Sequence, residues 1–224
     1  MPCTPPAPPE PVPLAWRVIV PVKEQAVAKS RLTAPAGVSK SALAHAMARD
    51  TVQAATAAVA QGAVAVVTCD VAMTAWATHQ GIATIADPGQ GLNAAVNAAQ
   101  SVLSTGPMAV LLGDLPALRP EQLRSALIEC SRHPLAFVPD HSGTGTVLLA
   151  STRPGLVPCF GENSAWRHEQ ATGAVRLALP VDGLRQDVDD ATDLAAAVAL
   201  GVGAHTRRVL AGPTTQRADR RQPI

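Results

Sequence analysis

The residues whose type and spacing best fit metal-dependent chemistry are aspartates. Asp114 ends the apolar run MAVLLGD, and Asp187 and Asp189 lie together in the segment 186–190. In an extended segment these last two side chains point to one side, where two carboxylates repel each other unless a cation lies between them. Because magnesium prefers carboxylate and phosphate oxygens, we predict that all three bind metal. The alternative for Asp114 is a turn residue bonded to its own backbone, and Asp190 is expected to cap the following helix.

Lysine is concentrated in one loop. The chain has three lysines against fifteen arginines, and Lys23 and Lys29 lie with Arg31 in the loop after the run WRVIVPV. A flexible ammonium is a good point charge for a polyphosphate, and arginine adds a planar fork of donors. The loop lacks the spacing of a P-loop, so it is not one. The alternative to phosphate binding is a basic loop whose charged side chains are simply exposed to solvent.

Two glycine-containing segments have the chemistry to bind a small carboxylate. HSGTGT ends at Thr146, and FGENS contains Gly161 and Ser164. Glycine permits close backbone approach, and Ser164 is expected to cap a helix whose N-terminal N–H groups face an anion. A turn followed by a helix cap is the alternative. His168 and Glu169 are adjacent on that expected helix and point in different directions, so they form no acid–base pair.

Composition excludes several classes of protein. The 224 residues carry a net charge of +1, and only 2% are aromatic, which argues against nucleic-acid binding. No apolar run reaches about 18 residues, so no membrane span is expected. The four cysteines show no zinc-site spacing, and Cys69 is expected in the core. Without the pattern of a signal peptide, a cytoplasmic location is expected. The sequence is compatible with a homodimer.

The elements that must position these residues alternate along the chain. Apolar and β-branched runs predict strands, and alanine-rich runs with helical spacing predict helices. The strands are expected over 16–22, 63–69, 81–87, 108–114, 135–140, 145–151 and 175–181, and the helices over 39–60, 71–80, 92–103, 120–131, 164–172 and 190–200. This order predicts one α/β domain, a mostly parallel central sheet with helices on both faces. Ligands of such sheets bind outside the carboxyl ends of the strands.

The domain is expected over 15–211. Residues 1–14 contain seven prolines and are expected to form a flexible arm. Residues 212–224 are polar and basic and are expected to form a flexible tail.

Six segments, taken in order, resemble the CofC/FbiD family of guanylyltransferases in coenzyme F-420 biosynthesis. They read VPVK with AKSRL, GLNAA, LLGDLPAL, FVPDHSGTGTVLL, FGENSAWRHEQATGA and RQDVDDATDL, and they cover about 17–201. The resemblance implies a nucleotide-diphospho-sugar transferase-like, MobA-like Rossmannoid fold. It also implies transfer of GMP from GTP to phosphoenolpyruvate, giving enolpyruvyl-2-diphospho-5'-guanosine and pyrophosphate.

The alanine-rich composition, with arginine in excess over lysine, is typical of a GC-rich bacterial genome. Within the family that the chain resembles, this favours the branch that uses phosphoenolpyruvate, and 2-phospho-L-lactate is the alternative acceptor. A noncatalytic nucleotide-binding domain of the same fold is a second alternative.

The resemblance also implies roles for individual residues. Asp114, Asp187 and Asp189 would bind magnesium; Lys23, Lys29 and Arg31 the triphosphate; Asn93 the nucleotide; and Thr146, Gly161 and Ser164 the carboxylate of the acceptor. Asp114, Lys23 and Lys29 would be the catalytic residues.

Overall fold

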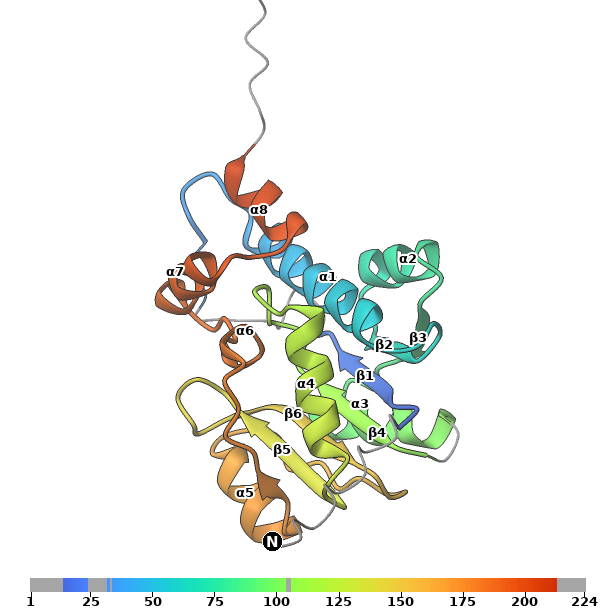
Figure 1. Ribbon diagram of the computed structural model, residues 1–224. Coiled ribbons are helices and arrows are strands. Elements are labelled where there is room, and N and C mark those ends of the chain that lie inside the picture. The colour runs from blue at the N-terminus through green and yellow to red at the C-terminus, as the bar shows by residue number, and fades with distance from the viewer. Residues whose placement is uncertain (1–13, 24–31, 33, 104–105, 213–224) are drawn as a thin grey trace, which may run out of the picture.

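The computed structural model describes residues 14–23, 32, 34–103 and 106–212. In this part of the chain a seven-stranded sheet has the order β3-β2-β1-β4-β6-β5-β7 (Figure 1). The strands are β1 (Arg17–Pro21), β2 (Val64–Thr68), β3 (Ala83–Ala86), β4 (Met108–Leu111), β5 (Leu135–Pro139), β6 (Thr146–Ser151) and β7 (Val175–Arg176). β6 is antiparallel to β4 and β5, and the other pairs are parallel. The predicted α/β fold with a mostly parallel sheet is confirmed.

Helices cover both faces of this sheet. They are α1 (Lys40–Ala58), α2 (Val71–His79), α3 (Leu92–Val102), α4 (Pro120–Cys130), α5 (Ser164–Thr172), α6 (Asp182–Arg185), α7 (Ala191–Leu200) and α8 (Ala204–Ala211). Along β1, Val18 and Val20 pack on the face that α1, α2 and α4 cover. Ile19 packs on the opposite face with α3 and α5. Burial on both faces explains why the strand reads as a continuous apolar run.

The C-terminal helices form a separate layer against α1. Leu43 and Met47 of α1 share a buried cluster with Leu194 of α7, and α8 packs on α1 (Figure 1). The buried Asp50 carboxylate accepts hydrogen bonds from the backbone N–H groups of His205 (2.9 Å) and Thr206 (2.8 Å), in the first turn of α8. Sequence reasoning missed α8, whose anchor in α1 lies 155 residues earlier in the chain and leaves no local signal. None of the described helices is both long and apolar enough to cross a membrane.

Several predicted helix ends are confirmed. The Ser39 side chain accepts from the N–H of the third residue of α1, and Pro120 occupies the first turn of α4. Asp190 caps α7, and Gly173 ends α5 in the left-handed conformation with φ 67°. These motifs are local, so the sequence shows them directly.

Three details of the sequence prediction are wrong. Ser164 is not the cap of α5: Asn163 holds that position with φ 53°, makes no side-chain cap, and leaves Ser164 as the first helical residue. Cys69 is exposed, since β2 ends at Thr68. The strand expected over 175–181 is two residues long. It lies at the sheet edge, and Pro180 further along has no N–H with which to continue a ladder.

Candidate functional site

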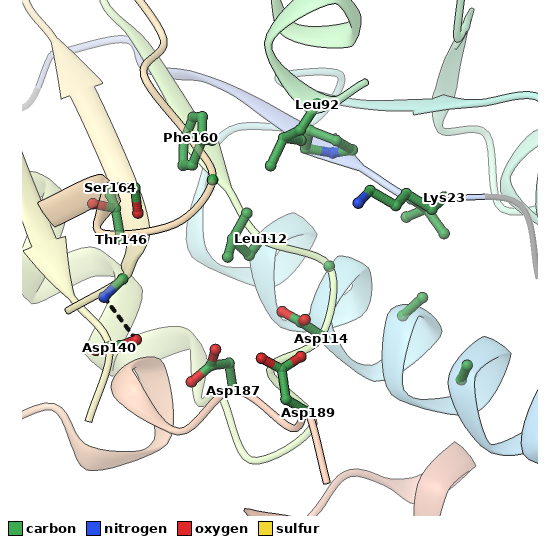
Figure 2. Close-up of a pocket in the computed structure, with 17 residues that line it drawn as sticks. Lys23, Leu92, Leu112, Asp114, Asp140, Thr146, Phe160, Ser164, Asp187 and Asp189 are labelled. Atoms are coloured by element: carbon green, nitrogen blue, oxygen red, sulfur yellow. Dashed lines mark hydrogen bonds between the residues drawn. The ribbon is translucent and has the colours of Figure 1, made fainter. Parts of the chain in front are cut away.

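A cavity of about 340 Å³ opens at one edge of the sheet (Figure 2). β1, β4 and β5 end at this edge, and β6 begins there because it runs antiparallel to its neighbours. Of the residues predicted to carry chemistry, the structure brings together Lys23, Asp114, Thr146, Gly161, Ser164, Asp187 and Asp189 in the lining of this cavity. Lys29 and Arg31 lie outside the described residues.

Asp114 is held by the turn that follows β4. A Cβ atom on Gly113 would lie 2.9 Å from the Pro21 carbonyl oxygen, so only glycine lets this turn pass so close to the end of β1. On the other side of Asp114, the buried Leu115 N–H donates to Thr51 Oγ1 of α1 at 3.0 Å. The turn is therefore fixed at both ends, which holds Asp114 in the lining of the cavity.

The second acidic segment is docked against this turn by its middle residue. The Val188 N–H donates to the Asp114 carbonyl oxygen at 3.2 Å, and the Val188 side chain is fully buried in the cluster with α1 and α7. Asp187 and Asp189 point to the other side, toward Asp114 and the cavity (Figure 2). The predicted alternation is confirmed. Carboxylates more than 70 positions apart in the sequence thus converge through one backbone hydrogen bond and one buried valine.

A fourth carboxylate, Asp140, also lines the cavity, and sequence reasoning missed it. It follows β5 and accepts hydrogen bonds from the N–H groups of Thr144 (3.0 Å) and Gly145 (2.9 Å). A Cβ on Gly145 would collide with this carboxylate. Asp140 therefore shapes the loop that leads into Thr146. The segment DHSGTG carries the turn composition that could have identified it.

The charges in the cavity favour a bound cation. Of the lining residues that the structure describes, four are carboxylates and one, Lys23, is a cation. Within the described residues no three His, Cys, Asp or Glu side chains already stand close enough to enclose a metal ion. Magnesium does not require such a cage, because it keeps several waters and takes one or two carboxylates together with substrate phosphates. The donor set of Asp114, Asp187 and Asp189 fits that chemistry.

The opposite wall carries the residues predicted to bind a carboxylate. Thr146 and Ser164 both line the cavity on this side (Figure 2), and Gly161 belongs to the loop before α5. The Asn93 side-chain amide holds this loop by hydrogen bonds to the backbone N–H and the backbone carbonyl of Phe160. Its Oδ1 accepts from the Phe160 N–H at 2.9 Å, and its Nδ2 donates to the Phe160 carbonyl at 3.2 Å. The structure thus gives Asn93 a loop-positioning contact, and the nucleotide contact stays a prediction.

Behind this wall lies His168, to which sequence reasoning gave no role. The ring is fully buried, with Nδ1 at 2.9 Å from Thr146 Oγ1 and Nε2 at 2.9 Å from the Cys159 backbone nitrogen. The Phe160 ring packs edge-on against it at 5.0 Å between centroids. Burial, and to a lesser extent the nearby Arg167 charge, lowers the pKa of His168 to about 4, so the ring is neutral at pH 7.

Comparison with known proteins decides the family. The model of the family described as "Guanylyl transferase CofC like" matches residues 16–212. The chain belongs to this family. The predictions of the family and of a nucleotidyltransferase are thereby confirmed.

Curated relatives agree with this family, and a solved structure agrees with the fold. A phosphoenolpyruvate guanylyltransferase from Geodermatophilus obscurus is 45% identical over 205 residues, covering 88% of this chain and 95% of the relative. A phosphoenolpyruvate guanylyltransferase from Streptomyces coelicolor is 47% identical over 208 residues, covering 88% of this chain and 97% of the relative. A Desulfovibrio desulfuricans structure named as a nucleotide-diphospho-sugar transferase superposes with a TM-score of 0.60 at 18% identity, covering 88% of this chain and 93% of that one. At that identity it supports the fold alone.

Proposed function

We propose that this chain transfers GMP from GTP to phosphoenolpyruvate, giving enolpyruvyl-2-diphospho-5'-guanosine and pyrophosphate. The observation that carries the proposal is the convergence of Asp114, Asp187 and Asp189 on one cavity with Thr146, Gly161 and Ser164. A set of metal-binding carboxylates thus faces a set of carboxylate-binding groups. Relatives at 45% and 47% identity carry the name phosphoenolpyruvate guanylyltransferase, which favours that acceptor over 2-phospho-L-lactate.

The acceptor is placed by the wall around α5. Ser164 is the first residue of this nine-residue helix, whose N-terminal N–H groups and dipole favour an anion. Gly161, with φ 123° in a region that favours glycine, permits the loop to approach a ligand closely. The acceptor's carboxylate binds here, which leaves its phosphate directed toward the aspartates.

The reaction joins two polyanions. An oxygen of the acceptor phosphate forms a bond to the α-phosphorus of GTP, and the bond from that phosphorus to the β-phosphate bridging oxygen breaks. Pyrophosphate leaves with the electron pair. The attacking phosphate is already ionised, so no general base is needed, and positioning with charge neutralisation supplies the catalysis.

The predicted metal-binding aspartates and the basic residues have separate roles in that neutralisation. Asp114, Asp187 and Asp189 would hold magnesium, which would supply positive charge to neutralise the reacting phosphates. Lys23 stabilises the charge that develops on the departing pyrophosphate. The same proposal assigns Lys29 and Arg31 to the triphosphate, the product to coenzyme F-420 biosynthesis and the protein to the cytoplasm.

The test is an assay of pyrophosphate release with the product identified by mass. GTP is offered with magnesium and with phosphoenolpyruvate and 2-phospho-L-lactate at equal concentrations, and ATP and CTP serve as nucleotide controls. We expect the guanosine adduct of phosphoenolpyruvate to dominate. Dominance of the phospholactate adduct would assign the other acceptor, and GTP binding without pyrophosphate release from any acceptor would support a noncatalytic domain.

A matched pair of variants tests the metal-binding carboxylates. Asp114→Asn removes a charge from the cavity while keeping the side-chain shape, and we expect turnover to fall at least 100-fold with the fold retained. Glu121→Gln removes a charge from α4, where the side chain is 72% exposed, and should leave turnover unchanged. Wild-type turnover in Asp114→Asn would remove this residue from the mechanism.

A further inference from the structure

We propose that His168 is a positioning residue that makes the Thr146 hydroxyl a one-way hydrogen-bond donor toward the acceptor's carboxylate. This inference rests on the proposed function for the identity of the acceptor. The rest of the argument depends on the two hydrogen bonds that His168 makes behind the cavity wall that contains Thr146. Thr146 begins β6 on one side, and Cys159 belongs to the loop before α5 on the other.

The backbone fixes which nitrogen of His168 carries the proton. The Cys159 N–H can only donate, and it lies 2.9 Å from Nε2. Nε2 must therefore accept with its lone pair, so in the neutral ring the proton lies on Nδ1. Isolated imidazole side chains usually carry the proton on Nε2, so the fold imposes the less common tautomer on this ring.

The same contact opposes a second proton on the ring. An imidazolium would direct its Nε2–H at the Cys159 N–H, leaving two donors facing each other in a buried place. The His168 ring is fully buried, so its charged form would lose its hydration. Arg167 on the same helix adds a like charge, which also disfavours the imidazolium. The lowered pKa agrees with this geometry. The ring therefore remains a neutral Nδ1 donor across the physiological range.

The tautomer determines what the Thr146 hydroxyl can do. Nδ1–H donates to Thr146 Oγ1 at 2.9 Å, so the hydroxyl oxygen acts as an acceptor in that bond. Its own proton must then be directed elsewhere, and the side chain lines the cavity. Within the described chain its hydroxyl has no second hydrogen-bond partner. The hydroxyl thus presents a donor to the ligand, polarised by the bond it accepts.

Because the Thr146 hydroxyl presents a hydrogen-bond donor to the cavity, it favours a ligand group that accepts a hydrogen bond. A carboxylate oxygen is an acceptor only, whereas a hydroxyl or amide can turn a donor to the protein. The chain of bonds from Cys159 through His168 to Thr146 therefore favours an ionised acid at this position. It also couples the β6 wall to the loop that carries Gly161, so both sides of the subsite keep one spacing.

The first experiment reads the tautomer directly in the wild-type protein. Long-range ¹H–¹⁵N correlation spectra of ¹⁵N-labelled protein at pH 7 distinguish protonated from unprotonated imidazole nitrogens. The His168 signals are assigned by their contacts with the Phe160 ring. We expect Nδ1 protonated and Nε2 unprotonated. A ring protonated at Nε2, or at both nitrogens, would overturn the inference.

The second experiment separates the hydrogen bond that His168 makes through Nδ1 from the one that it makes through Nε2. In His168→Asn the amide nitrogen takes the place of Nδ1 and keeps a donor toward Thr146. In His168→Gln the amide oxygen takes the place of Nε2 and keeps only the bond from Cys159. We expect His168→Gln to lower kcat/KM for phosphoenolpyruvate roughly 10- to 100-fold, the range for a hydrogen bond to a charged group. His168→Asn should retain most of that value, and the KM for GTP should stay unchanged in both.

Coupling to Thr146 completes the test. Thr146→Val removes the hydroxyl, so adding His168→Gln to it should cause little further loss. Equal losses in His168→Asn and His168→Gln, additive effects with Thr146→Val, or a matching rise in the KM for GTP would indicate a merely structural histidine and overturn the inference. Where a variant fails to fold, the wild-type spectrum decides. If the wild type releases no pyrophosphate from GTP and phosphoenolpyruvate, the proposed function fails, while the spectrum still tests the tautomer.

Discussion

Thr51→Val tests whether a single buried hydroxyl on α1 holds the turn that carries Asp114. Thr51 is fully buried, accepts from the Leu115 N–H at 3.0 Å and donates to the Met47 carbonyl at 3.0 Å. Valine has nearly the same shape, so the packing is kept. The Leu115 N–H, however, loses its partner in a place where no other residue of the described structure replaces it.

The expected cost follows from that unpaired group. A buried donor left without a partner costs about 1–3 kcal/mol. For a chain of this size, 1 kcal/mol corresponds to a change of about 2–4 °C in Tm, so Thr51→Val should lower Tm by roughly 4–8 °C at the middle of that range. The turn is also released on one side of Asp114, so kcat should fall by about tenfold or more, as small misplacements of catalytic groups cost rate.

Thr56→Val is the matched control. Thr56 lies on the same helix and donates to the carbonyl four residues earlier at 2.9 Å, as Thr51 does. In the described part of the chain, however, its hydroxyl accepts no backbone N–H. Its loss should stay within about 0.5 kcal/mol. Urea and thermal unfolding measure the free energy, and pyrophosphate release measures kcat. If Thr51→Val is no less stable than Thr56→Val, the turn is not held by this hydroxyl and the reasoning is refuted.

Three further predictions address the turn, a helix end and acid stability. Gly113→Ala forces a Cβ against the Pro21 carbonyl and should cost about 1–3 kcal/mol on urea unfolding, with a lower kcat; unchanged values would show that the turn has room. Asp190→Ala removes the side-chain cap of α7 and should cost about 1 kcal/mol in the same measurement, whereas Asp190→Asn should retain most of it. The pKa of His168 is lowered to about 4, so as pH falls the unfolded chain takes up this proton first and stability decreases. From pH 7 to pH 5 this group should remove roughly 2 kcal/mol from the free energy of unfolding, and His168→Gln should lose correspondingly less; identical pH dependence in both proteins would contradict the assignment.

Local patterns in the sequence determined the elements and several of their ends. β1, β2 and β4 are predicted by apolar runs because both of their faces are buried in the sheet. The cap at Asp190 is set by contacts within a few residues. The side-to-side alternation of Asp187 and Asp189 follows from extended backbone geometry alone. Each of these features depends on neighbours in the chain, which is the information a single sequence carries.

Only the tertiary structure decided which residues meet. Val188 docks on Asp114, and Thr51 supports the turn beside it, through contacts between segments far apart in the chain. Asn93 reaches Phe160 across 67 positions, whereas the family resemblance implies a nucleotide contact for it. Such pairings leave no periodic signal, because they depend on how the strands are ordered in the sheet.

His168 is the clearest example of a residue whose contacts the sequence alone does not indicate. The sequence places it beside Glu169 on a helix and gives no reason to connect it with Thr146, 22 positions earlier. The antiparallel course of β6 brings Thr146 to the edge where the parallel strands end, and α5 then covers it. The proton position on the ring is fixed by one backbone N–H from a third segment. A tautomer set by a tertiary contact is visible only once the chain is folded, since burial and a fixed partner create it together.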